Sequence, residues 1–128
     1  MGQPIVHFEI IGQDPQKLQS YYGDLFGWKF DTSAPVAETI SRVGKYGFVN
    51  RNTTEDRVGI PGGVGGGPSY HSYAIFYVGV PNVGIALQKA ERLGGTRVMG
   101  PVKNPGKDLV VAHFTDPEGN LIGLAGPV

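Results

Sequence analysis

Two ionisable side chains near the start of the chain, His7 and Glu9, stand two residues apart. The run around them, residues 4–11, is rich in β-branched and aromatic residues, which predicts a strand. Alternate side chains of a strand point to the same face, so His7 and Glu9 share one face. The apolar side chains that alternate with them share the other face. A carboxylate beside an imidazole orients the ring and raises its basicity, so this pair is a candidate for acid/base chemistry without a metal ion.

The other two histidines, His71 and His113, lie beside or within further predicted strands. Residues 72–80 and 108–115 have the composition of strands, and His71 is in phase with Tyr73 at the start of the first. Both histidines are therefore candidates for the wall of one polar cavity. The alternatives are a position at a strand edge for His71 and a hydrogen-bonded pocket position for His113.

Aromatic side chains accompany these groups. Rings give a pocket area for stacking on a flat ligand, and hydroxyl groups fix the orientation of that ligand. The residues considered for such a pocket are Trp28, Tyr46, Phe48, Tyr70, Tyr73 and Tyr77. Packing in the core is the alternative for each of them, and it is the preferred interpretation of Phe8, Phe76 and Phe114.

The elements that must position these groups follow one plan twice. Residues 5–28 and residues 73–95 each contain a β-rich run, a small polar residue and an amphipathic stretch. Leu25-Phe26-Gly27 in the first aligns with Leu93-Gly94-Gly95 in the second at an offset of 68 residues. This pattern predicts an internal duplication, in which a site between the modules takes its groups from equivalent strands.

Each stretch predicts a helix. Asp14 is an N-cap residue, Pro15 suits the first helical position and Gly27 ends the pattern, so we expect a helix over residues 14–26. Asn82 caps the second helix, which ends at Gly94-Gly95. The apolar positions at helical spacing are Leu18, Tyr21, Tyr22 and Leu25 in the first helix, and Val83, Ala86, Leu87, Ala90 and Leu93 in the second.

The remaining β-rich segments complete the order β-α-β-β-β in each half. They are residues 28–32, 40–51 and 57–60 in the first half, and residues 96–99, 108–115 and 121–125 in the second. The prediction is a single α+β domain over residues 1–128, with module one at 4–61, a glycine-rich hinge at 61–69 and module two at 70–127. The hinge lacks the Gly-Lys-Ser/Thr ending of a phosphate loop, so we expect a flexible linker or pocket lid.

Composition narrows the class of partner. A chain of 128 residues suits one domain with a conventional core. The absence of cysteine excludes disulfides and thiolate metal sites and fits a reducing cytoplasm, which is the expected location. The 11 Lys and Arg balance the 11 Asp and Glu without a basic stripe, and no run reaches the ~18 apolar residues of a membrane span. Neither nucleic acid nor a membrane is an expected partner.

Four motifs identify a family that the sequence resembles. They are His7-Phe8-Glu9-Ile10, Tyr21-Tyr22-x-x-Leu25-Phe26-Gly27-Trp28, Ala90-x-x-Leu93-Gly94-Gly95, and FTDPEGNLIGL at residues 114–124. They resemble those of the vicinal oxygen chelate superfamily, which contains glyoxalase I, bleomycin-resistance proteins, extradiol dioxygenases and fosfomycin-resistance enzymes. The resemblance implies a curved, cupped mixed sheet built from the paired modules, and a homodimer. It does not name a reaction, because the superfamily supports many unrelated activities.

The resemblance also implies where a divalent metal ion would bind. Metal-dependent members use histidines and carboxylates on the first and last strands of each module and leave positions open for two substrate oxygens. His7 matches the first of these positions, but its partner is Ile75, or Tyr73 if the register shifts by two. Gly123 stands where metal-binding relatives commonly have glutamate, and residues 58–61 at the predicted end of module one offer no ligand. The usual metal site is therefore not expected.

The function predicted from these features is metal-independent binding, with sequestration as one form of it, of a small, partly aromatic molecule, with no cofactor. The expected ligand-binding residues are His7, Glu9, Tyr46, Phe48, Tyr73 and His113. An enzyme is the alternative. It would be a lyase, isomerase or dioxygenase that holds Fe, Mn, Ni or Zn through His7, Glu9, His71 and His113, or a metal-free isomerase with His7 and Glu9 as the catalytic acid/base pair.

Overall fold

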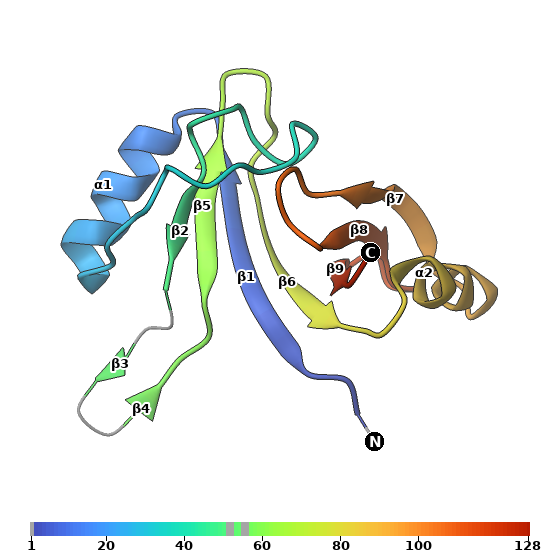
Figure 1. Ribbon diagram of the computed structural model, residues 1–128. Helices are drawn as coiled ribbons and strands as arrows, with labels where there is room; N and C mark the ends of the chain where they lie inside the picture. The colour runs from blue at the N-terminus through green and yellow to red at the C-terminus, as the bar shows by residue number, and fades with distance from the viewer. Residues whose placement is uncertain (1, 51–52, 55–56) are drawn as a thin grey trace. The chain divides into compact units, whose positions relative to one another are not determined.

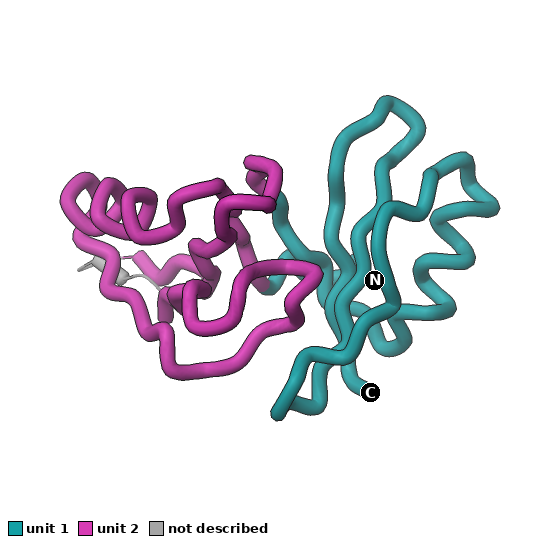
Figure 2. The backbone as a smooth tube through the Cα atoms, turned by 90° about the horizontal axis from the view of Figure 1, so that it is seen from above, with its two compact units in different colours: residues 1–6, 75–128 teal, residues 7–74 magenta. Residues whose placement is uncertain are grey.

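The computed structural model describes residues 2–50, 53–54 and 57–128. The chain divides into two compact units: unit 1 contains Met1–Val6 and Ile75–Val128, and unit 2 contains His7–Ala74 (Figure 2). Each unit combines one helix with part of a mixed β-sheet, so the predicted α+β class is confirmed. The division of a single domain into modules at 4–61 and 70–127 stays a prediction.

Unit 2 carries most of the residues singled out in the sequence. Its elements are β1 (Ile5–Gly12, from residue 7 onward), α1 (Pro15–Phe26), β2 (Gly47–Val49), β3 (Thr53–Thr54), β4 (Arg57–Val58) and β5 (Gly62–Gly66) (Figure 1). The strands lie in the order β2-β5-β1, with β5 parallel to β1 and antiparallel to β2. In this register Glu9 pairs with Gly63. α1 packs against β5, and β3 and β4 form a separate antiparallel pair.

Unit 1 also combines one helix with a group of strands. Its elements are β6 (Tyr73–Gly79, from residue 75 onward), α2 (Val83–Arg92), β7 (Thr96–Lys103), β8 (Val110–Thr115) and β9 (Leu121–Gly126). The strands lie in the order β6-β9-β8-β7, and the parallel pairing of β6 with β9 sets Tyr77 opposite Gly123. α2 packs against β7, β8 and β9 (Figure 1). The core beneath it contains Val83, Leu87, Ala112 and Leu124.

The two helices begin as the sequence predicts. The Asp14 side chain accepts the backbone N–H of Lys17 at 3.1 Å, and the Asn82 side chain accepts that of Ile85 at 3.0 Å. These caps stand 68 residues apart, as do Glu9 and Tyr77, which face Gly63 and Gly123 in the two parallel pairings. The predicted offset of the duplication is thus confirmed.

The glycine-rich segment is not the predicted hinge or lid. Gly62–Gly66 forms β5, and all five of its residues are buried. A Cβ atom on Gly62 would stand 2.1 Å from the Phe8 ring, whereas one on Gly63 would stand 2.0 Å from the Tyr46 ring. Rings from neighbouring segments therefore lie directly on both faces of this strand. The glycines of β5 allow these rings to approach the backbone closely. The hinge interpretation was wrong because it took the glycines as a sign of flexibility.

Several other boundaries differ from the prediction. Residues 28–32 form no strand and contribute only an isolated bridge between Asp31 and Phe48. Within residues 40–51, only Gly47–Val49 is a strand in the described part, and residues 51–52 lie outside it. Of the predicted strand 57–60, only Arg57–Val58 forms a strand, and it is followed by β5, which was not predicted as a strand. The second half was predicted more closely, since β6, β8 and β9 agree within two residues at each end and β7 extends four residues further.

Some side chains expected in the core are exposed. Phe76 is 39% exposed, and Leu93 at the end of α2 is 70% exposed. On α1, Tyr21 and Leu25, for which only helical spacing was predicted, are more than half exposed. Neither α1 nor α2, the two helices of the described residues, is long and apolar enough to cross a membrane.

Candidate functional site

A buried carboxylate stands at the centre of unit 2. Glu9 on β1 is only 2% exposed, and each of its oxygens accepts a tyrosine hydroxyl. Tyr46 Oη donates to Oε1 at 2.9 Å, and Tyr73 Oη donates to Oε2 at 2.8 Å. Hydrogen bonds to an ionised acceptor are stronger than neutral ones, so the two hydroxyls offset part of the cost of burying the carboxylate.

Tyr46 also joins Glu9 to His7. The Nε2 atom of His7 lies 3.0 Å from Tyr46 Oη. Because an ionised carboxylate only accepts, the Tyr46 hydroxyl proton is directed to Glu9, and Nε2 of His7 is then the donor to the same hydroxyl. The sequence prediction that His7 and Glu9 share a face is correct, and a tyrosine from the segment before β2 connects them.

Burial keeps both tyrosines protonated. It raises the pKa of Tyr46 well above its ordinary value, and the negative charge of Glu9 raises it further. The pKa of Tyr73 is raised for the same two reasons, burial being the larger. Both hydroxyls therefore remain hydrogen-bond donors to Glu9 at physiological pH.

The cluster contains both fully buried and half-buried side chains. Glu9 and Tyr46 are fully buried, whereas His7, Phe48 and Tyr73 keep part of their surface accessible. The Phe48 ring lies 4.8 Å from that of Tyr46 and 6.4 Å from that of His7, measured between centroids.

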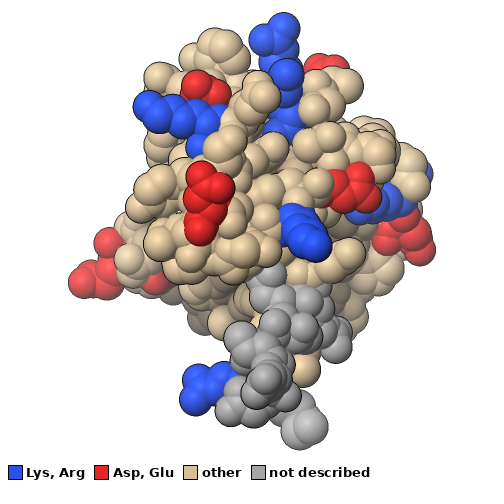
Figure 3. Space-filling model, turned by 90° about the vertical axis from the view of Figure 1, so that its left-hand side faces the viewer, with Lys and Arg blue, Asp and Glu red and all other residues tan. Residues whose placement is uncertain are grey.

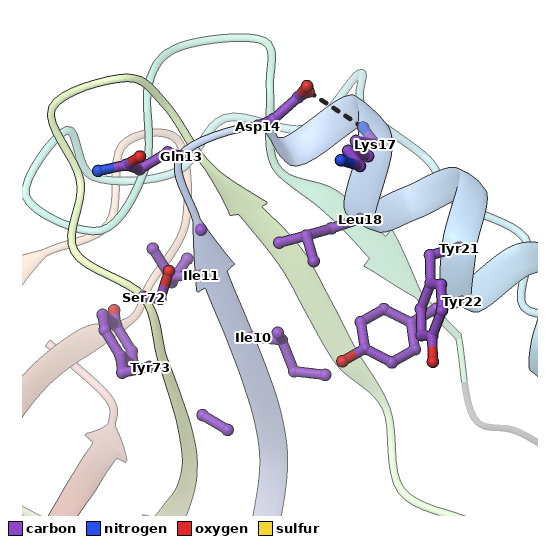
Figure 4. Close-up of a pocket in the computed structure, with 12 residues that line it drawn as sticks. Ile10, Ile11, Gln13, Asp14, Lys17, Leu18, Tyr21, Tyr22, Ser72 and Tyr73 are labelled. Carbon is purple, nitrogen blue, oxygen red and sulfur yellow. Dashed lines mark hydrogen bonds between the residues drawn. The ribbon is translucent and has the colours of Figure 1, made fainter.

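A cavity of about 620 Å³ borders Tyr73 in the same unit (Figure 4). This volume falls within the range of small-molecule sites. Figure 4 shows Leu18, Tyr21 and Tyr22 extending from α1 and Ile10 from β1 around it. Sequence reasoning used Leu18, Tyr21 and Tyr22 only as evidence for a helix and did not place α1 beside a cavity.

His113 and Tyr77 form a hydrogen-bonded pair in unit 1. Its Nε2 atom lies 2.7 Å from the hydroxyl of Tyr77, and both residues are buried. Burial lowers the pKa of His113 from an ordinary 6.5 to about 4. The imidazole is therefore neutral at physiological pH. The prediction of a hydrogen-bonded histidine on this strand agrees with the structure, although its role in binding a ligand stays a prediction.

The residues present do not fit the metal centre of metal-dependent relatives. Gly63 and Gly123, on the last strands of the two modules, lie under tyrosine rings: a Cβ atom would stand 2.0 Å from Tyr46 Cε1 and 2.4 Å from Tyr77 Cδ1, respectively. Neither position has room for a carboxylate side chain. His71, in the alternative ligand set, is exposed and precedes β6. Across residues 2–50, 53–54 and 57–128, no group of three or more His, Asp or Glu side chains could hold a metal ion.

Replacing Tyr46 with phenylalanine tests the cluster. Tyr46→Phe keeps the ring over β5 but leaves one Glu9 oxygen without this donor, so we expect the free energy of unfolding to fall by about 1.5 kcal/mol. Urea denaturation at pH 7 measures the change. Tyr70→Phe is a suitable control, because the Tyr70 hydroxyl donates to the backbone carbonyl of Glu38 in an exposed bond. Equal stability of Tyr46→Phe and wild type would contradict the role given to this hydroxyl.

Comparisons with known proteins agree with the fold. The family model described as Glyoxalase/Bleomycin resistance protein/Dioxygenase superfamily matches residues 4–124. A variant of methylmalonyl-CoA epimerase from Streptomyces coelicolor, solved with 2-nitronate-propionyl-CoA, is similar with a TM-score of 0.68, 13% identity and 98% of each chain covered. Methylmalonyl-CoA epimerase from Mycobacterium tuberculosis gives a TM-score of 0.62 and 12% identity, covering 97% of this chain and 87% of that one.

A hypothetical protein from Bacillus halodurans C-125 is similar to the same degree. Its TM-score is 0.63 at 12% identity, with 100% of this chain and 96% of that chain covered. No curated protein matches this sequence significantly. At these identities the solved structures establish a shared fold and leave the reaction open.

Proposed function

We propose that this chain, which belongs to the Glyoxalase/Bleomycin resistance protein/Dioxygenase superfamily, binds a small, partly aromatic molecule without a metal ion. The observation that carries the proposal is the packing of Gly63 and Gly123 under the rings of Tyr46 and Tyr77. These rings take the space that a metal-binding carboxylate would need. The nearby carboxylate, Glu9, has both oxygens bonded to tyrosine hydroxyls.

The half-buried side chains of the cluster support the proposal of an aromatic ligand. Phe48 and Tyr73 offer ring surface for stacking, and His7 offers a polar group that fixes the ligand's orientation. The buried side chains of Glu9 and Tyr46 contact these groups and hold them in place. We also propose His113, in unit 1, as a ligand-binding residue. The proposal includes a homodimer in the cytoplasm.

Two titrations test this function. Chelator-stripped protein titrated calorimetrically with Mn, Fe(II), Ni and Zn should show no stoichiometric site tighter than about 10 μM, roughly 7 kcal/mol. A thermal-shift screen of aromatic molecules should then find ligands that raise the melting temperature, because a ligand that binds only the folded state stabilises it. For the best of them, His7→Ala should weaken binding at least tenfold, whereas the exposed His71→Ala should not. A one-per-chain metal site abolished by His7→Ala would overturn the proposal.

A metal-free isomerase is the second candidate, and one observation favours it. His7, Tyr46 and Glu9 form a continuous hydrogen-bonded chain with steps of 3.0 and 2.9 Å, along which a proton can pass between imidazole and carboxylate. Because two of the similar structures are methylmalonyl-CoA epimerases, methylmalonyl-CoA in D₂O is a reasonable first probe. Exchange of its α-hydrogen, lost in His7→Ala while binding persists, would favour the isomerase.

A further inference from the structure

The cavity of about 620 Å³ beside α1 lies on the other face of β1 from the cluster around Glu9. Along β1 the side chain of Ile10 follows that of Glu9, so the two point to opposite faces. Ile10 lines the cavity. Gly12 alternates in phase with Ile10, and a Cβ atom on it would stand 2.6 Å from Leu18 Cδ1, so α1 lies on this face too. The cavity is therefore a second space, separate from that cluster.

Tyr73 and Ala74 mark the boundary between the two spaces. The Tyr73 hydroxyl donates to Glu9 Oε2 at 2.8 Å, which places this side chain on the Glu9 face. Ala74 is the next residue on β6, so its side chain points to the opposite face, where it lines the cavity. Ala74 is small and exposed. The cavity is thus open beside this strand, and a larger side chain at residue 74 would fill it.

The rings of Tyr21 and Tyr22 form a corner of the cavity (Figure 4). Their centroids are 5.1 Å apart, and their planes meet at 83°. Tyr22 is fixed in turn by Phe26 and Trp28, whose ring centroids lie 5.9 and 5.6 Å from its own. A flat ring placed in such a corner stacks on one tyrosine and meets the other edge to face, and both are favourable aromatic contacts. The corner therefore favours an aromatic ligand.

Lys17 supplies a positive charge at the other end of the cavity. Asp14 and Lys17 are the charged residues that line it. The Asp14 carboxylate accepts the backbone N–H of Lys17 at 3.1 Å, and Figure 4 shows it pointing away from Ile10. In the described part of the chain the Lys17 ammonium group has no ion pair or hydrogen bond. It is therefore available to an anionic group of a ligand.

The spacing of the charge and the rings fits a small aromatic carboxylate. Lys17 and Tyr21 are four residues apart, so they lie on one side of α1, about 6 Å apart along its axis. This separation is close to the length of one aromatic ring that carries a carboxylate. Figure 4 shows Leu18 and Ile10 extending into the space between the two ends, where they provide apolar contact. The volume is sufficient for a ligand of one or two fused rings.

The surrounding surface argues against a polyanionic ligand. Figure 3 views the side on which α1 lies in Figure 1, and its described residues show Lys and Arg scattered among acidic and uncharged side chains. The formal net charge of the chain is +0 at pH 7. Nucleic acids and other polyanions are recognised by clustered cations. A single carboxylate matches the single lysine at the cavity.

We propose that the cavity beside α1 is a second binding site, which takes a small aromatic carboxylate with its ring against Tyr21 and Tyr22 and its carboxylate at Lys17. The inference goes beyond the proposed function, because this site uses neither His7 nor Glu9 and lies on the other face of β1.

An amide NMR titration with β-naphthoate and its neutral counterpart β-naphthamide tests the site. Naphthoate should cause saturable shifts at the backbone amides of α1, with a Kd below about 1 mM. Lys17→Met keeps the apolar stem of the side chain and removes its charge. It should weaken naphthoate about three- to fivefold, a modest loss because Lys17 is exposed, and leave naphthamide binding unchanged. Lys29→Met is the matched control and should affect neither probe, because Lys29 is exposed and does not line the cavity.

Filling the cavity should have the larger effect. Ala74→Leu should weaken both probes at least tenfold, because the added side chain occupies their space. His7→Ala should leave the shifts at α1 unchanged, and circular dichroism checks that each variant is folded.

Three results would overturn the proposal. The first is the absence of a saturable shift at α1 up to about 5 mM of either probe. The second is an equal loss of naphthoate and naphthamide binding in Lys17→Met. The third is binding that His7→Ala abolishes and Ala74→Leu leaves intact. That third result would place the probe at the cluster around Glu9 and would support the proposed function, so the two proposals can fail separately.

Discussion

The Gly63→Ala variant should lose about 3 kcal/mol of unfolding free energy, although glycine is ordinarily the weaker residue in a strand. A methyl group at this position would stand 2.0 to 2.2 Å from three atoms of the Tyr46 side chain, Cε1, Cζ and Oη. Tyr46 is buried, and its hydroxyl is bonded to Glu9 and to the His7 ring. The ring therefore cannot move aside without breaking those bonds.

Urea denaturation measures this loss, and Gly84→Ala is the matched control. A Cβ atom on Gly84 in α2 would meet only the Asn82 side-chain oxygen, at an ordinary 3.5 Å, so alanine there should stabilise the protein by about 0.5 kcal/mol. Combining Gly63→Ala with Tyr46→Ala should cost at least 1 kcal/mol less than the sum of the two single changes. A stable Gly63→Ala variant, or a purely additive cycle, would falsify the packing argument.

Both modules place a glycine of their last strand under a tyrosine ring. In each, a glycine on the last strand pairs with a residue of the first strand and lies under a tyrosine ring. The polar partners differ, since Tyr46 donates to Glu9 whereas Tyr77 is bonded to His113. The source of the ring differs too, because Gly63 pairs with Glu9 and is covered by Tyr46 from another segment, whereas Gly123 is covered by Tyr77, the residue with which it pairs.

Local signals in the sequence predicted the helices and the repeat. Asp14 and Asn82 each accept the backbone N–H three residues further along the chain. Such a cap depends on neighbouring residues only, so it can be recognised from the sequence alone. Alternation with period two placed His7 and Glu9 on one face, as the structure has them. Such short-range patterns depend on backbone geometry and not on packing between distant segments.

The glycine-rich strand and the bridging tyrosine could not be predicted in this way. β5 has almost no side chains, so it shows no alternation, and the rings that cover it come from Phe8 and Tyr46 elsewhere in the chain. Tyr46 is 37 residues from Glu9 in sequence, and no spacing rule joins them. The spacing of the apolar residues on α1 predicted the helix but not how far each side chain is buried: Tyr21 and Leu25 are exposed, whereas Leu18 and Tyr22 are half-buried.

Lowering the pH from 7 to 5 should destabilise the protein by about 2 kcal/mol through His113 alone. Burial lowers the pKa of this imidazole in the folded state to about 4, against an ordinary 6.5. Below pH 6.5 the unfolded chain takes up a proton that the folded chain does not, so stability falls as the pH drops. The loss ends below about pH 4, where the folded state is protonated as well.

The difference between wild type and His113→Gln isolates this effect, because other titrating groups contribute to both. Glutamine keeps an acceptor for the Tyr77 hydroxyl but has no proton to gain. Between pH 7 and pH 5 the His113→Gln variant should therefore lose about 2 kcal/mol less unfolding free energy than the wild type loses. If the His113→Gln and wild-type curves ran parallel, the imidazole would have to be protonated or solvated in the folded protein. The buried pair with Tyr77 would then not be the neutral hydrogen bond described above.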